Sequence, residues 1–112
     1  ELDEAIALTQ TATQRAPEVA LGWYNLGLML RRRGDIAAAL EAYSRAVELD
    51  PNNAACHQNR AVALLLGGDI EGSRAAFRTA ITLLETQGRP VDAQALRTKA
   101  QGIVKLDLEP IA

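Results

Sequence analysis

The chain has 112 residues, which is enough for one compact domain and too few for two. Hydrophobic residues make up 48% and charged residues 23%, as in ordinary globular domains, so the composition argues against a disordered chain. Twelve basic and fourteen acidic residues give a net charge of −2, which argues against a nucleic-acid binder, and no apolar run is long enough for membrane insertion.

The sequence repeats itself with a period of 34 residues, which places Pro17 opposite Pro51 and Tyr43 opposite Phe77. Small residues and turn residues recur at the same offset: Gly27 with Ala61 and Ala95, and Gly34 with Gly68 and Gly102. One period over most of the chain indicates a repeat protein. Units of such a protein cannot bury their apolar stripes alone, so they stack on their neighbours.

Residues 1–17 align with the second half of the repeat and predict the second helix of a partial repeat. Because the first helix of that repeat is missing, we expect apolar surface to be exposed at Leu2, Ile6 and Leu8. Such a surface would favour the association of copies of the chain with one another.

Residues 20–53 predict a complete pair of antiparallel helices. On the first helix, Trp23, Leu26 and Leu30 recur at the spacing of one helical face. Three arginines, at residues 31–33, come before Gly34, the residue type that most readily adopts the left-handed conformation ending a helix. We assign these arginines to the negative end of the helix dipole rather than to a phosphate site.

The second helix of this pair is predicted to begin after Asp35, its N-cap, and to end before Asp50, because a residue preceding proline disfavours helix. Small residues such as Gly27 allow the helices to approach closely, and Tyr43 is expected to fill the space between successive pairs. The residues expected to be buried on this second helix are Ile36, Ala39, Leu40, Tyr43, Ala46 and Val47.

Residues 54–87 predict a second pair of the same design, in which two glycines at 67 and 68 precede Asp69, the predicted cap of its second helix. Cys56 and His57 are adjacent, so on a helix they face different directions, and no further ligands complete a metal site. We predict that Cys56 is an inert packing residue. The residues expected to be buried on the second helix are Ile70, Phe77, Ala80, Ile81 and Leu84.

Residues 88–112 predict a partial repeat or a capping helix followed by a tail. Pro90 suits the first turn of a helix, and Val91, Ala95 and Leu96 are expected to cover the preceding pair. Residues 103–108 would extend this helix, start another one or form an apolar tail. Since almost no segment alternates with period two, the predicted fold class is all-α.

Nine residues of the first pair resemble the signature of the tetratricopeptide repeat (TPR) family. They are Ala20, Trp23, Leu26, Gly27, Gly34, Ala39, Tyr43, Ala46 and Pro51. The second pair departs from this signature at Arg60, Ala61, Glu85 and His57, of which His57 is expected to occupy the aromatic position. The resemblance implies a right-handed α-solenoid of antiparallel helix pairs. It also implies a single TPR domain over residues 1–112, made of segments 1–17, 20–53, 54–87 and 88–112.

The resemblance further implies a concave groove, formed by the first helix of each pair, that holds a peptide or helix of a partner. Leu28, Val62 and Leu96 share one repeat position and would form an apolar row, unless Leu28 and Val62 mainly pack between adjacent first helices. The other groove candidates form two flanking rows and one pair of amides expected to bind a partner's backbone: Tyr24, Gln58 and Asp92; Arg31, Leu65 and Lys99; and Asn25 and Asn59.

Some TPR domains grip a terminal carboxylate with a clamp of Lys, Asn and Arg residues. Asn59 and Arg89 match two of the clamp positions in this sequence, but Tyr24, Leu28 and Ala93 occupy the others. Without the first basic residue a carboxylate would lose a charged partner. A chaperone-type clamp is therefore disfavoured.

The favoured function is a protein–protein interaction module that acts as a scaffold or adaptor within a larger protein and binds a protein or peptide partner. We predict no metal, no cofactor and no catalytic residues, because no nucleophile is paired with a base, so an enzyme is not expected. Self-association into a homo-oligomer and a passive structural spacer are the alternatives. The composition is that of a soluble chain, for which we favour the cytoplasm.

Overall fold

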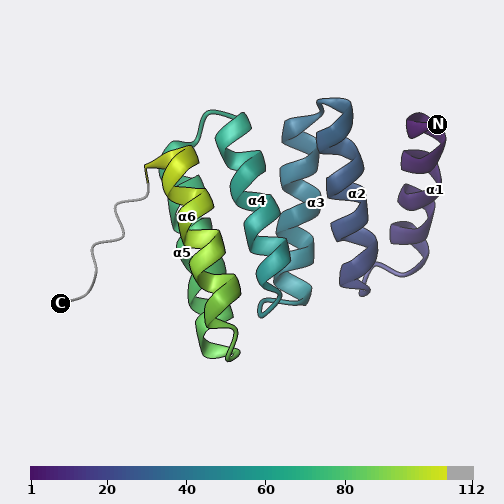
Figure 1. Ribbon diagram of the computed structural model, residues 1–112. Helices are drawn as coiled ribbons and strands as arrows, with labels where there is room; N and C mark the ends of the chain where they lie inside the picture. The colour runs from purple at the N-terminus through teal and green to yellow at the C-terminus, as the bar shows by residue number, and fades with distance from the viewer. Residues whose placement is uncertain (106–112) are drawn as a thin grey trace.

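The structure is a computed structural model that describes residues 1–105, and these residues form helices without any strand. The helices in chain order are α1 (Leu2–Arg15), α2 (Ala20–Arg33), α3 (Ile36–Leu49), α4 (Ala54–Leu66), α5 (Ile70–Thr86) and α6 (Pro90–Val104). They run alternately up and down and stack in chain order from α1 to α6 (Figure 1). The predicted all-α class and the stacked helix pairs are confirmed.

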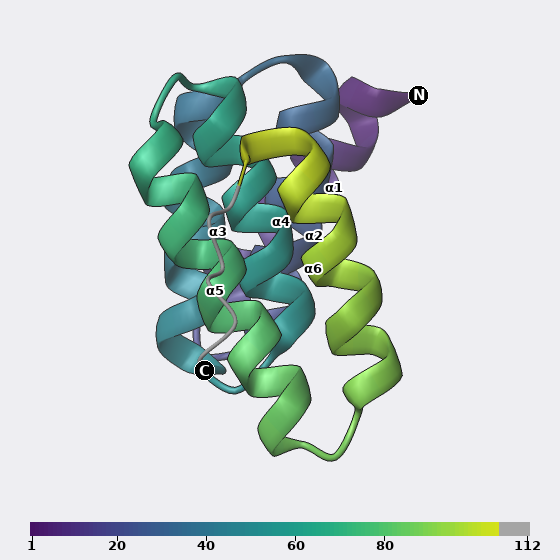
Figure 2. The ribbon, with the colours of Figure 1, turned by 60° about the vertical axis from the view of Figure 1, so that its left-hand side comes forward.

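The stack has two layers, with α2, α4 and α6 on one side and α3 and α5 behind them (Figures 1 and 2). The turns between the layers follow local chemistry, since Gly34 and Gly68 have φ angles of 96° and 90°, a conformation that residues with a Cβ rarely adopt. Asp69 accepts a hydrogen bond from the Gly72 N–H at 2.8 Å, as an N-cap should. Asp35 holds the equivalent position but accepts from Arg33 at 2.6 Å instead.

Buried residues form one continuous core along the stack. Tyr43 is fully buried in a cluster shared by α1, α2, α3 and α4, and Phe77 is fully buried in a cluster shared by α4, α5 and α6. Leu40 of α3 packs against both clusters. The two aromatic rings therefore have the predicted role of filling the space between successive helix pairs.

The expected burial of the second helices is correct at most positions and wrong at the first position of α5. Ile36 and Leu40 are half-buried, whereas Ile70 is 48% exposed. Ile36 is covered by the turn at Gly67 in the next pair, because its Cγ2 lies 3.5 Å from where a Cβ on Gly67 would be. Ile70 lacks such cover because α6 follows α5 in a different register from that of α4 after α3.

Helix α1 is packed more completely than expected for half a repeat. Ile6 is only 2% exposed and lies in the same cluster as Tyr43, Leu2 is half-buried against that cluster, and Leu8 is 73% exposed. An ion pair between Asp3 and Arg33 at 3.2 Å also ties α1 to α2. The predicted exposed apolar surface on α1 is therefore reduced to Leu8, because α2 covers the face that carries Leu2 and Ile6.

Helix α6 contacts the core through a face that the repeat period did not predict. Val91 is 81% exposed and Ala95 is also exposed, whereas Ala93 and Leu96 are buried. The reason is that α4 starts 34 residues after α2, but α6 starts 36 residues after α4. A start two residues later turns a helix face by about 200° at about 100° per residue. The helix extends to Val104, and the remainder of the segment 103–108 lies outside the described residues.

Candidate partner-binding groove

The predicted groove face is built where α2 and α4 lie side by side. Asn59 of α4 donates one amide N–H to the Tyr24 hydroxyl of α2 and another to the Ala55 carbonyl, both at 2.9 Å. The expectation that the Asn59 amide binds a partner's backbone is therefore wrong for its N–H groups, which already have acceptors. Asn25, on the same helix as Tyr24, is exposed.

The predicted apolar row is present on α2 and α4 but not on α6. Leu28 and Val62 are half-buried, with Leu28 packed against the cluster of Tyr43 and Val62 packed against that of Phe77. Leu65 has the same half-buried position further along α4. Leu96 is only 5% exposed and belongs to the core. Each half-buried side chain therefore supports the core with one side and keeps the other open to a partner.

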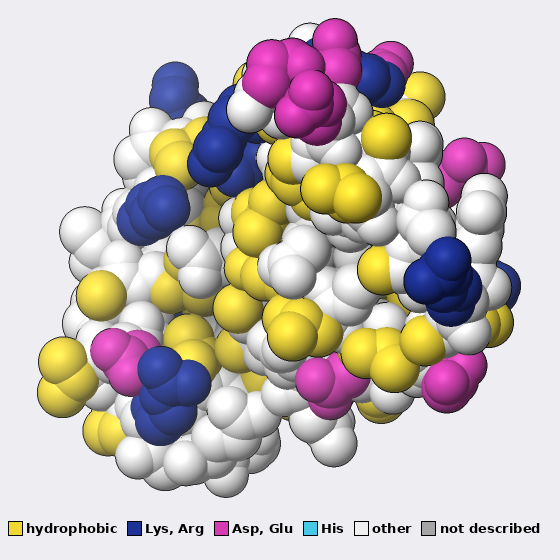
Figure 3. Space-filling model, turned by 90° about the vertical axis from the view of Figure 1, so that its right-hand side faces the viewer, with side chains coloured by type: hydrophobic (Ala, Val, Ile, Leu, Met, Phe, Trp, Pro, Cys, Tyr) yellow, Lys and Arg dark blue, Asp and Glu magenta, His cyan; other side chains and the backbone are white. Residues whose placement is uncertain are grey.

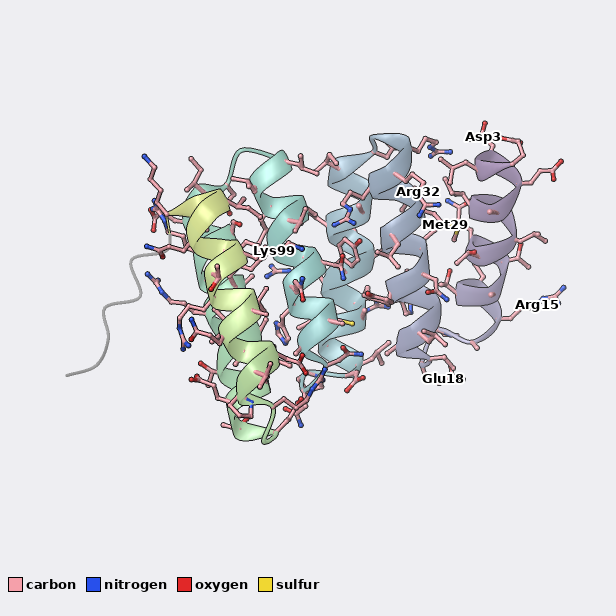
Figure 4. The ribbon with its side chains drawn as sticks, viewed as in Figure 1. Asp3, Arg15, Glu18, Met29, Arg32 and Lys99 are labelled. Carbon is pink, nitrogen blue, oxygen red and sulfur yellow. The ribbon has the colours of Figure 1, made fainter. Side chains whose placement is uncertain are left out.

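A hollow of about 280 Å³ lies between α4 and α6 and brings together four of the predicted groove residues. These are Gln58, Asp92, Leu96 and Lys99. Lys99 leaves α6 toward α4 (Figure 4). Asp92 forms an ion pair with Arg89 at 2.9 Å, so one acid of this hollow is already neutralised. Seen from the α1 end, the surface is hollowed between its two halves, and hydrophobic side chains lie along the hollow (Figure 3).

Arg31 stands near two tyrosine hydroxyls at the junction of α2 and α4. Burial raises the pKa of Tyr24, and the positive charge of Arg31 opposes this rise. Burial raises the pKa of Tyr43 to about 12, again against the effect of Arg31. The rings of Tyr24 and Tyr43 are 6.2 Å apart, and the fully buried Tyr43 hydroxyl has no hydrogen-bond partner among the described residues.

A second hollow, of about 530 Å³, lies over α3 and was not predicted. Trp23 and Leu40 line it, and the Arg45 guanidinium lies 5.4 Å from the centre of the Trp23 ring, which is a cation–π contact. The helical spacing of α2 or α3 taken separately carries no signal for this contact, since it depends on how the two helices face each other.

Two family models of the tetratricopeptide repeat match the chain, one over residues 20–53 and the other over residues 42–95. The chain belongs to the tetratricopeptide repeat family. A TPR repeat-containing protein of Synechococcus elongatus is 37% identical, and the match covers 92% of this chain and 34% of that protein. The TPR segment thus spans about a third of the length of this relative.

Solved structures confirm the TPR superhelix. The translocator chaperone SycD of Yersinia enterocolitica has a TM-score of 0.82 at 16% identity, with 91% of this chain and 71% of that chain covered. PcrH, solved with the chaperone-binding region of PopD, has a TM-score of 0.79 at 24% identity, with 93% and 76% covered. At these identities the likeness concerns the fold alone.

His57 occupies the aromatic position of the TPR signature in the second pair, as predicted. The Trp23 indole N–H donates to the Pro17 carbonyl at 2.8 Å, and His57 Nε2 donates to the Pro51 carbonyl at the same distance. Both contacts connect a first helix to the turn before it. A ring N–H that reaches the preceding proline is thus the property that the two residues share.

Cys56 is expected to be unreactive in the folded TPR segment. Its thiol is buried, and burial raises its pKa from 9.0 to about 11, so the nucleophilic thiolate is scarce. Since the unfolded thiol ionises first, its contribution to stability is complete below pH 9 and is lost as the pH rises toward 11. We expect iodoacetamide to label Cys56 only in denaturant, and Cys56→Ala to flatten the alkaline decline in the free energy of unfolding. Rapid labelling of the native chain would contradict this prediction.

Within residues 1–105, no group of three His, Cys, Asp or Glu side chains is arranged to hold a metal ion. None of the helices in that part of the chain combines the length and the hydrophobicity needed to cross a bilayer.

Proposed function

We propose that this TPR segment is a scaffold or adaptor that binds a peptide or helix of a partner protein along the face of α2, α4 and α6. The observation that carries the proposal is the pair Leu28 and Val62, which keep apolar surface open on two adjacent first helices. Amphipathic segments bind such surfaces through apolar side chains spaced along one face. PcrH, which shares the fold, was solved with a segment of PopD, and this supports a peptide as the occupant.

We also propose that the segment has no catalytic activity of its own. The chain has one cysteine and one histidine, and both have packing roles in the structure. The thiol of Cys56 is buried, and the ring of His57 is held by the Pro51 carbonyl. Nothing on the groove face among residues 1–105 pairs a nucleophile with a base.

The proposal is tested by capturing partners from a lysate of the source cells. The test variant carries Leu28→Lys and Val62→Lys, which place charge on the apolar surface. The matched control carries Ala37→Lys and Ala75→Lys, at exposed positions of α3 and α5. Circular dichroism first establishes that both variants remain helical. Mass spectrometry then compares the proteins that each form retains.

We expect the wild type and the control to retain the same partner and the groove variant to lose it. Equal retention by all three forms would place binding outside the groove and overturn the proposal. Retention by none would favour the passive spacer. Self-association is not included in the proposal, because the apolar surface that suggested it is reduced to Leu8.

A further inference from the structure

The junction between α2 and α4 has more hydrogen-bond donors than acceptors. Asn59 donates to the Tyr24 oxygen, so the Tyr24 hydroxyl proton points to some other acceptor. The Tyr43 hydroxyl behind it is fully buried and has no partner among the described residues. A buried hydroxyl without a partner is uncommon in folded proteins, since it loses its hydrogen bonds to water without replacement. The junction therefore lacks an acceptor.

Arg31 adds a positive charge to this junction. It follows Tyr24 by seven residues and Leu28 by three, so the three side chains share one face of α2. Long side chains on a helix lean toward its N-terminus, which directs the Arg31 guanidinium toward Leu28 and Tyr24. The effect of Arg31 on the pKa values of both Tyr24 and Tyr43 agrees with this placement.

The charge of Arg31 is not balanced within the groove. Helices α2 and α4 contain four arginines between them and no aspartate or glutamate, although the whole chain has a net charge of −2. Arg33 pairs with Asp3 and Asp35, whereas half-buried Arg31 has no ion pair among residues 1–105. The nearest candidate on α6 is Asp92, which pairs with Arg89. The groove face thus favours an acidic partner.

We propose that Arg31 and the Tyr24 hydroxyl bind a carboxylate side chain of the partner, so that the occupant of the groove is an amphipathic segment with Asp or Glu beside its apolar residues. The apolar residues contact Leu28 and Val62, and the carboxylate accepts hydrogen bonds from Arg31 and Tyr24. This inference rests on the proposed function and adds the chemistry of the partner. It differs from the terminal-carboxylate clamp, since the carboxylate belongs to an internal residue.

The first test selects binders from a displayed library of random peptides of about 12 residues, just over three helical turns, each fused at both ends so that no terminus is free. We expect the wild-type segment to select peptides with apolar residues at helical spacing and an enriched Asp or Glu beside them. The Arg31→Gln variant should select peptides with the same apolar pattern but without the enriched acid.

The second test measures the dissociation constant of one selected peptide, with Glu or Asp and with the corresponding amide. Arg31→Gln and the peptide amide should each weaken binding about tenfold, and the two changes together should weaken it little further, because they remove the same interaction. Tyr24→Phe should also weaken binding. Arg32→Gln is the matched control, since Arg32 leaves α2 on the side of α1 (Figure 4), and should change binding less than about twofold.

The outcomes separate this inference from the proposed function. Selected peptides that require Leu28 and Val62 but show no enriched acid, and that bind Arg31→Gln as tightly as wild type, would overturn the inference and leave the proposed function intact. Peptides whose binding is unaffected by Leu28→Lys and Val62→Lys, or a library that yields no binder, would overturn both.

Discussion

Replacing Phe77 by alanine is expected to lower the free energy of unfolding by about 3–5 kcal/mol. Phe77 is fully buried and packs with residues of α4, α5 and α6, so its removal leaves a cavity where two successive helix units meet. A small domain has a total stability on the order of 5–15 kcal/mol, so the loss is a large share of it. In a stacked protein this loss also separates the units on either side, because each unit contacts only its neighbours.

Urea unfolding followed by circular dichroism measures this effect. Val91→Ala is the control, because Val91 is also apolar but 81% exposed, and we expect it to change stability by less than about 0.5 kcal/mol. A loss for Phe77→Ala as small as that of the control would mean that the α4–α6 cluster does not hold the stack together.

Replacing Gly27 by alanine is expected to destabilise the chain by about 1–3 kcal/mol, although alanine is the better helix former. A Cβ on Gly27 would lie 2.6 Å from Cε1 and 2.7 Å from Cδ1 of Tyr43. The Tyr43 ring is fully buried, so it has no free space into which it can move. The overpacking therefore outweighs the gain of up to about 1 kcal/mol in helix propensity.

Gly22 offers a matched control on the same helix. Its added Cβ would lie 3.4 Å from Thr13 Cγ2, which is an ordinary contact, so Gly22→Ala is expected to stabilise the chain by about 0.5–1 kcal/mol. Opposite signs for the two substitutions, measured by the same urea unfolding, would verify the close approach of α2 and α3. Stabilisation by Gly27→Ala would show that α2 and α3 pack less closely than described.

The ends of the helices could be predicted from sequence because local chemistry determines them. Gly34 and Gly68 take the left-handed conformation, and α3 ends at Leu49, just before the residue that precedes Pro51. Tyr43 and Phe77 could be placed in the core for a related reason, since helical periodicity shows which face of a helix is apolar. These signals lie within a few residues of the positions that they describe.

The register of α6 could not be predicted in this way. Helix α5 has 17 residues where α3 has 14, and α6 starts later by two residues than the repeat period requires. The alignment therefore predicted burial of Val91, whereas the structure buries Ala93. How far α5 continues depends on contacts with α6, such as that of Glu85 with Arg97 at 3.1 Å, and not on a local stop signal.

The sequence by itself determined the all-α repeat architecture, the helix boundaries and the rows of side chains on α2 and α4, because each follows from neighbouring residues or from a constant period. Only the tertiary structure decided which groups in the groove remain available to a partner. Asn59 lost its free N–H groups to Ala55 and to Tyr24, which is 35 residues away, and Leu96 moved from the groove into the core. The physical reason is that periodicity defines the face of one helix, whereas availability depends on what the neighbouring helices place against that face.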